Sequence, residues 1–226
     1  MTASLHKFGE YFPGTGAIQD VGYETGKNYS MNFPLTDGMD DEHYEYVFEP
    51  VMDEIFLRFR PDAVLLQCGA DSLSGDRLGC FNLSVRGHGK CVEYIKGKNI
   101  PMLVTGGGGY TLRNVPRCWT YETSVCLGYD LPNEIPEGNE YREYFCPEYK
   151  IHMPTSNMEN LNSREDLDNK KAKIFEMLKS VSATNVDMSN FQNGGSKVPD
   201  HLDYDASKER DMVEDKNMDV NTDTKA

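Results

Sequence analysis

Two loop residues of the sequence carry side chains that could take part in chemistry. Asp71 lies in the stretch 63–79, AVLLQCGADSLSGDRLG, where an apolar β-type segment leads into a loop of small residues. Tyr110 directly follows the four glycines at 106–109, after a second apolar segment. In open α/β sheets, ligands bind just beyond the carboxyl ends of such strands. If the two strands are neighbours, a carboxylate suited to a hard or borderline cation faces a phenol suited to donating a hydrogen bond to an oxyanion.

Purely structural roles are open for both residues. Aspartate is an ordinary turn former, and Tyr110 could simply pack against the protein. The glycine run lacks both the GxGxxG spacing and a following Lys-Ser or Lys-Thr, which argues against a nucleotide site. His88 is interpreted as a core histidine rather than a metal ligand, because no other ligand type lies at helical spacing from it.

Alternating helical and extended patterns predict an α/β fold. Apolar residues recur at helical spacing over 41–59, a helix that Pro50 should kink. Further helices are expected at 84–97, at 114–127 with Asn114 as N-cap, and at 163–181. Strands are expected at 28–35, ended by Pro34, at 63–66 and at 100–105, whereas 1–27 is expected to be loop. This order implies right-handed crossovers and a parallel sheet.

The remaining segments carry no regular pattern. Residues 128–162 are loop-rich, and four aromatic residues are expected to anchor them: Tyr141, Tyr144, Phe145 and Tyr149. Beyond residue 182 the composition is polar, Asp-rich and poor in aromatics, which cannot bury enough surface to offset the entropy of ordering. The sequence therefore predicts a domain over 1–182 and a disordered acidic tail over 183–226.

The overall composition excludes several classes of protein. A formal net charge of -14 argues against direct binding to nucleic acid, which needs clustered Lys and Arg. The six cysteines show no paired spacing of a zinc knuckle or redox dithiol, so a reduced, intracellular chain is expected. No basic region with a long apolar core opens the sequence, and no apolar run reaches membrane length.

Three motifs resemble those of class I histone deacetylases: HKFGEYFPGTG at 6–16, LQCGADSLSGDRLGCFNLS at 66–84 and GGGGYTLRNVPRCWTYET at 106–123. The resemblance covers about residues 1–162. It implies part of the arginase/deacetylase-type α/β fold, a parallel sheet flanked by helices, with the N-terminal half missing. It also implies hydrolysis of acetyl-lysine on histone tails by zinc-activated water, in transcriptional repression.

The resemblance assigns roles at the centre of the site. Asp71 matches the second aspartate of the family's Asp, His, Asp zinc triad. Tyr110 matches the tyrosine whose hydroxyl polarises the amide carbonyl and stabilises the tetrahedral intermediate. Phe12 matches a wall of the narrow channel that grips the acetyl-lysine stem, and Leu78 lies near its rim.

The resemblance also assigns roles outside the centre. Ser4, Leu5 and Tyr29 fall where the family binds structural K⁺ ions, largely through backbone carbonyls. Arg77 and Arg113 match basic residues that help hold an inositol phosphate at the interface with corepressor subunits. Two arginines near a loop are also ordinary surface residues. The implied location is the nucleus, with the cytoplasm as a further compartment.

The sequence departs from the family in its catalytic set. By the resemblance, the family's tandem histidines, which act as general base and acid, and its Asp-x-His zinc ligands precede the region where this sequence starts. No two of the five histidines of this sequence are adjacent. One carboxylate from a three-ligand site cannot hold catalytic zinc, so the chain alone is expected to be inactive. The alternative is a non-catalytic, truncated pseudo-enzyme that binds corepressors or competes with a full-length protein.

Overall fold

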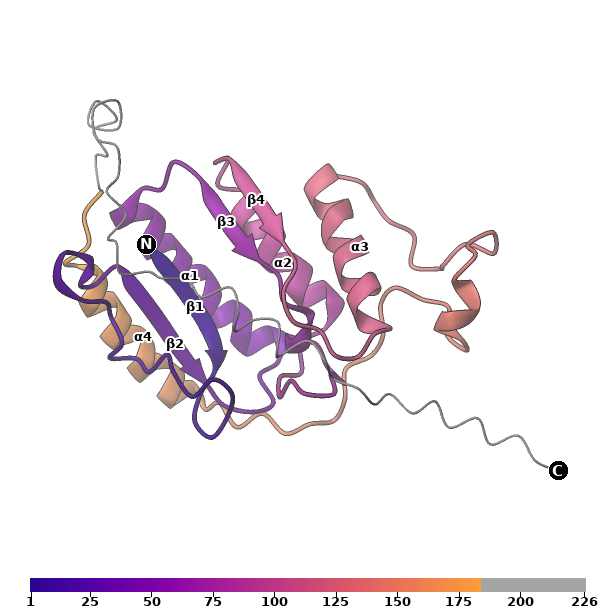
Figure 1. Cartoon of the computed structure of the whole chain (residues 1–226), viewed down its shortest axis with the longest axis horizontal. Helices are drawn as coiled ribbons and strands as arrows, with labels where there is room; N and C mark the ends of the chain where they lie inside the picture. The colour runs from indigo at the N-terminus through magenta and orange to yellow at the C-terminus, as the bar shows by residue number, and fades with distance from the viewer. Residues whose placement is uncertain (184–226) are drawn as a thin grey trace, which may run out of the picture. The chain divides into compact units, whose positions relative to one another are not determined.

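The computed structural model describes residues 1–183, so the expected acidic tail over 183–226 falls outside the described residues except for its first residue. The fold is α/β, with parallel strands flanked by helices (Figure 1), as the sequence predicts. In chain order the main elements are β1 (Thr2–Lys7), β2 (Ser30–Leu35), α1 (Asp41–Phe59), β3 (Val64–Gln67), α2 (Val85–Lys96), β4 (Met102–Thr105), α3 (Asn114–Leu127) and α4 (Arg164–Leu178). No helix of residues 1–183 is long and apolar enough to cross a membrane.

The strands form two parallel pairs. β1 pairs with β2, and β3 pairs with β4, so that Gln67 at the end of β3 lies opposite Thr105 at the end of β4. Parallel neighbours require a crossover connection, and α2 supplies it between β3 and β4. The two apolar segments are therefore neighbours, which is the condition under which Asp71 and Tyr110 emerge at one edge.

The core lies between β2 and the helices that cover it. Met31, Phe33 and Leu35 of β2 are at most 1% exposed and belong to one apolar cluster with Val47 of α1 and Leu167 of α4. The helix α1 packs against both α4 and α2, and α2 packs in turn against α3 (Figure 1). Burial of these aliphatic and aromatic side chains holds the helices in place around the strands.

Side-chain caps fix where three helices begin. Asp40 accepts a hydrogen bond from the backbone N–H of His43 at the start of α1, as an N-cap does. Ser84 and Ser163 cap α2 and α4 in the same way. These helices begin within one residue of their predicted positions, because a cap followed by apolar residues at helical spacing is a strong local signal.

One prediction near the N-terminus was wrong. β1 lies within residues predicted as loop, and its first three side chains are exposed, so no apolar pattern announces it. The strand predicted over 28–35 is confirmed as β2, which ends one residue after Pro34, and Pro34 lies opposite His6. Within residues 1–183, β2 pairs on one side only, and a strand with an unpaired side can hold a residue without N–H.

The predicted cap of α3 was also wrong. Asn114 is the first helical residue rather than the N-cap, which is Arg113 and makes no side-chain cap. The side chain of Asn114 donates instead to the carbonyl of Ser74 at 3.2 Å. Its capacity for hydrogen bonding is therefore used to tie α3 to the loop after β3.

The loop-rich segment is anchored by fewer aromatic side chains than predicted. Phe145 is buried at 8% exposure, whereas Tyr141 and Tyr144 are 67% and 44% exposed. Tyr149 contributes through its backbone, whose carbonyl accepts from the N–H of Ile135 at 2.8 Å. Tyr141 was therefore wrongly predicted as an anchor, whereas the ring of Tyr144 keeps a contact with the side chain of Arg113.

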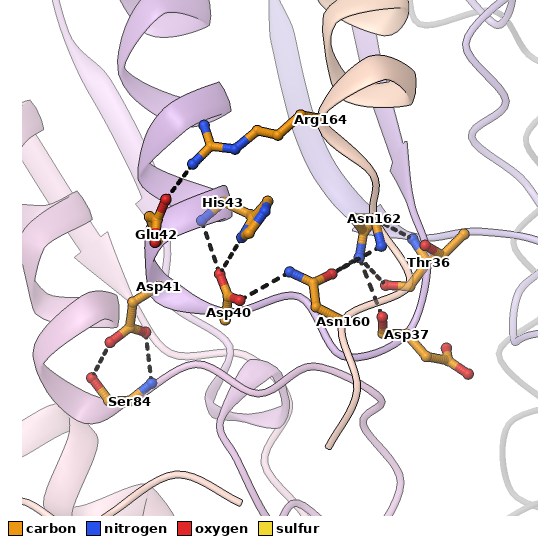
Figure 2. A network of polar contacts seen from close by, with 10 residues as sticks. All are labelled: Thr36, Asp37, Asp40, Asp41, Glu42, His43, Ser84, Asn160, Asn162 and Arg164. Carbon is orange, nitrogen blue, oxygen red and sulfur yellow. Dashed lines mark hydrogen bonds and ion pairs between the residues drawn. The ribbon is translucent and has the colours of Figure 1, made fainter. Parts of the chain in front are cut away.

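A polar network joins the approach to α4 to the turn before α1 (Figure 2). Asn162 is 2% exposed, accepts from the N–H of Thr36 at 2.8 Å and donates to the carbonyls of Thr36 and Asp37 at 3.0 and 3.2 Å. Asn160 donates to the carboxylate of Asp40 at 3.0 Å. These bonds satisfy buried backbone groups that no helix or strand pairs.

The same network continues to α2 (Figure 2). The carboxylate of Asp41, the first residue of α1, accepts from both the N–H and the hydroxyl of Ser84. The hydroxyl of Ser84 in turn accepts from the N–H of Gly87, and this bond caps the start of α2. Arg164 of α4 pairs with Glu42 of α1. The start of α1 therefore fixes the position of α2, which carries His88.

Candidate functional site

The loops that follow β3 and β4 meet at one edge of the strand pair. The N–H of Cys68 donates to the carbonyl of Thr105 at 2.8 Å, which extends the parallel pairing by one residue. The N–H of Ala70 donates to the carbonyl of Gly108 at 2.7 Å. Asp71 and Tyr110 therefore extend from two loops that are hydrogen-bonded to each other, as their positions after neighbouring strands suggest.

Glycines allow this close approach. A Cβ atom on Gly108 would lie 2.1 Å from Oδ2 of Asp71, and one on Gly69 would lie 2.8 Å from Oδ1. A Cβ on Gly107 would lie 2.9 Å from the Cα of Gly69. Real Cβ atoms do not come so close to other atoms, so the glycine run has the role of admitting the Asp71 carboxylate and its loop.

Asp71 has a carboxylate with few partners. Within residues 1–183 the one hydrogen bond that it accepts comes from its own backbone N–H. Burial raises the pKa of Asp71 above its usual value, and the negative charge of Asp76 raises it further, against a smaller lowering by His88. A half-buried carboxylate of this kind is suited to binding a cation, because a positive charge would offset its desolvation.

Asp76 lies near Asp71, but its carboxylate is fully engaged. Both of its oxygens accept backbone N–H groups, from its own loop and from the loop of Tyr110. Burial alone would raise the pKa of Asp76, but these four hydrogen bonds together hold it below the usual value. The two neighbouring carboxylates are therefore in different states, one free to take a ligand and one saturated.

A buried group of polar side chains lies beneath the Asp71 loop. One ring nitrogen of His88 (Nε2) lies 3.0 Å from the carbonyl of Gly69, and the other (Nδ1) contacts the carboxylate of Glu122, with the Sγ of Cys118 at 3.6 Å. Since both oxygens are acceptors, the ring donates from Nε2 and shares a proton with Glu122 at Nδ1. This contact ties the base of the Asp71 loop to α3.

Sequence reasoning missed Glu122 and Cys118. The prediction that His88 is a core residue is confirmed, since its side chain is 11% exposed. Its partners come from α3, 30 and 34 residues further along the chain, so spacing within α2 gives no sign of them. The signal that could have found them is a pair of polar residues on the inward face of the predicted helix 114–127.

Trp119 also holds this edge. Its indole N–H donates to the carbonyl of Cys68 at 2.8 Å. A Cβ on Gly106 would lie 2.7 Å from the ring, so the indole contacts the first glycine of the run. One side chain of α3 therefore touches both loops.

The residues expected to form the channel lie at the surface of the same region. Phe12 and Leu78 are 91% and 52% exposed, and Tyr110 is 45% exposed. The hydroxyl of Tyr11 donates to the carbonyl of Leu78 at 3.0 Å, which holds the segment of Phe12 beside the segment of Leu78. The roles of Phe12 and Leu78 in gripping a substrate remain predictions.

The two arginines expected at an inositol phosphate site have different surroundings. Arg77 is exposed. Arg113 donates to the carbonyl of Cys146 at 3.3 Å and lies over the ring of Tyr144 at 5.4 Å. Arg113 therefore has a structural role in holding the loop-rich segment, and the binding of a phosphate by either side chain remains a prediction.

The three residues expected to bind K⁺ lie along β1 and just before β2. Ser4 and Leu5 lie opposite Asn32 and Phe33, whereas Tyr29 comes one residue before β2. The carbonyl of Tyr29 accepts from the N–H of Thr2 at 2.9 Å. Coordination of K⁺ by these backbone carbonyls remains a prediction.

A zinc site needs at least three protein ligands. Asp71 fits as one of them, because its carboxylate is half-buried and lacks other donors. Within residues 1–183 the only set of three or more ligand-type side chains is His88, Cys118 and Glu122, and it does not include Asp71. Those three satisfy one another by hydrogen bonding. Around Asp71 the described residues therefore offer one candidate metal ligand and not a whole set.

Comparison with known proteins identifies the family. The histone deacetylase domain matches residues 1–126. Human histone deacetylase 1 is 59% identical over 179 residues, which are 79% of this chain and 37% of that protein. Probable histone deacetylase 1-B of Xenopus laevis is 54% identical over 212 residues, 93% of this chain and 42% of that protein. Histone deacetylase HDAC1 of Drosophila melanogaster is 58% identical over 79% of this chain and 34% of that protein.

The chain belongs to the histone deacetylase family, which confirms the resemblance of its motifs to class I members. It spans between about a third and two-fifths of the length of these curated relatives.

Proposed function

We propose that this chain contributes Asp71 and Tyr110 to the active site of a zinc-dependent lysine deacetylase acting on histone tails. The observation that carries the proposal is the meeting of the two loops. The loop of Asp71, whose carboxylate is half-buried and receives no hydrogen bond from another described residue, is hydrogen-bonded to the glycine loop that ends at Tyr110. Nuclear location, a role in transcriptional repression and partnership with corepressor subunits through an inositol phosphate belong to the same proposal.

The two residues have distinct chemical tasks in this proposal. Asp71 supplies one negatively charged oxygen ligand. Zinc, when bound, polarises the amide carbonyl and activates water. Tyr110 donates its phenolic hydrogen to the carbonyl oxygen, and this bond strengthens as negative charge develops on that oxygen in the transition state. Both ring nitrogens of His88, which lies beneath the Asp71 loop, have partners, so His88 is not free to act as the general base.

The 226-residue chain alone should therefore bind less than one zinc ion per chain and hydrolyse no acetyl-lysine peptide. Zinc is measured by competition with a coloured chelator, and hydrolysis by release of acetate. Coexpression with the segment of human histone deacetylase 1 that precedes its matching region should restore turnover. Tyr110→Phe should then lower kcat by about 100-fold or more, the usual effect of losing one oxyanion donor.

The matched control is Tyr141→Phe, which removes a hydroxyl from a tyrosine that is 67% exposed, on the segment beyond α3. It should leave turnover unchanged. Zinc-dependent hydrolysis by the chain alone would overturn the proposal that this chain contributes only part of the active site. A complemented protein in which Tyr110→Phe behaves like Tyr141→Phe would overturn the role of Tyr110. Binding to corepressor subunits without any restored turnover would favour the competing, non-catalytic role.

A further inference from the structure

The carboxylate of Asp76 joins the two loops of the candidate site. Its Oδ1 accepts from the N–H groups of Leu78 and Gly79 at 2.9 and 2.8 Å. Its Oδ2 accepts from the N–H groups of Tyr110 and Thr111 at 2.7 and 3.1 Å. A carboxylate offers about four lone-pair positions, and all are used here by backbone donors from segments more than 30 residues apart in the chain.

Little else fixes the position of Tyr110. Gly109 immediately before it has a φ of +150°, a conformation that L side chains rarely adopt, and three further glycines precede it. The side chain of Tyr110 is 45% exposed, so packing restrains it weakly. The hydroxyl of Thr111 donates to the carbonyl of Gly75 at 2.8 Å, which adds one neutral bond beside the charged ones.

We propose that Asp76 is a positioning residue that holds the backbone of Tyr110, and with it the phenol, in register with the Asp71 loop. The inference rests on the proposed function for the catalytic role of the Tyr110 hydroxyl, but the restraint on the Tyr110 backbone can be measured without zinc or turnover. Hydrogen bonds to an ionised acceptor are about twice as strong as neutral ones, so Asp76 dominates the local restraint. Asp71 is thereby left as the only one of the two carboxylates that can take a ligand.

The test compares Asp76→Asn with Asp20→Asn in the full 226-residue chain. Asparagine keeps the shape but replaces one accepting oxygen by an amide NH2, a donor that would face two backbone N–H donors. Asp20 is the matched control, because its Oδ2 also accepts two backbone N–H groups, from Gly16 and Ala17, within a different loop. Amide hydrogen exchange by NMR should be accelerated about tenfold or more at Tyr110 and Thr111 in Asp76→Asn only.

A second readout follows the phenol itself. With 3-fluorotyrosine at position 110, the ¹⁹F resonance should shift or split in Asp76→Asn and stay unchanged in Asp20→Asn. Asp76→Glu keeps the charge and should recover protection of the Tyr110 amide to within about threefold of the unsubstituted chain. If Asp76→Asn does not fold, Asp76→Ser replaces it, since a hydroxyl cannot bridge two loops. Unchanged exchange at Tyr110, or an unchanged ¹⁹F resonance, overturns the inference whether or not the zinc proposal holds.

Discussion

Replacing Glu122 with glutamine should remove a pH-dependent part of the stability of this protein. Burial alone would lower the pKa of His88, but its contacts with Cys118 and Glu122 raise it from 6.5 to about 10. Because the folded pKa is higher than the unfolded one, the stabilisation is fully present below about pH 6.5 and is lost as the pH rises to about 10. Each pKa unit corresponds to about 1.4 kcal/mol.

The full shift sets an upper limit of about 5 kcal/mol on this stabilisation, within the range of about 3–5 kcal/mol for breaking a buried ion pair. Glutamine has nearly the same shape as glutamate and can donate to Nδ1 of a neutral His88, so the variant should fold with an uncharged pair. Its deficit relative to the unsubstituted chain should be several kcal/mol at pH 6 and should shrink toward zero by pH 10.

Urea unfolding followed by far-UV circular dichroism at several pH values between 6 and 10 measures this deficit. Glu122 also raises the pKa of the nearby thiols of Cys68, Cys91, Cys118 and Cys126, so their ionisation does not cancel in the difference and is followed separately by thiolate absorbance. A suitable control is Glu134→Gln, because Glu134 makes only an exposed ion pair with Lys150 at 3.8 Å. A deficit that stays constant with pH, or grows toward pH 10, would refute the assignment of a shared proton to His88 and Glu122.

Two further predictions concern the turn between β2 and α1 and its polar network. Gly38→Ala should destabilise the fold by about 3 kcal/mol in thermal unfolding, because Gly38 has a φ of +73° and a Cβ would lie 1.9 Å from the carbonyl oxygen of Glu159. The control Gly26→Ala should be nearly neutral, because a Cβ at Gly26 would lie in open space. Asn162→Ala should cost about 3 kcal/mol in urea unfolding, because it leaves both backbone groups of Thr36 without their partner; a loss below about 1 kcal/mol would mean that water replaces the amide.

Local signals account for the parts of the fold that the sequence predicted well. The cap and apolar spacing of α1 and α2 lie within a few residues of each other, so each helix is specified by its own segment. β1 depends on hydrogen bonds to β2, whose paired residues lie 28 positions away, and its exposed first half carries no apolar alternation. A strand held mainly by backbone pairing leaves little trace in the sequence.

In the candidate site, too, some features follow from local sequence signals and others depend on distant residues. The position of Asp71 and Tyr110 at one edge follows from two strands of similar build, which a single sequence can show. The state of each carboxylate does not, because Asp71 and Asp76 both look like turn residues in the sequence. What separates them is the set of N–H groups around Asp76, which the fold of a distant glycine loop supplies.

Trp119 is an intrinsic fluorescent probe of the candidate site. It is the only tryptophan of the chain, its indole N–H donates to the carbonyl of Cys68, and its ring touches Gly106. Selective excitation of that one ring therefore reports on both loops of the candidate site without any label. Emission wavelength and quenching by acrylamide would register a loosening of either loop, or the arrival of a cation at the edge where Asp71 lies.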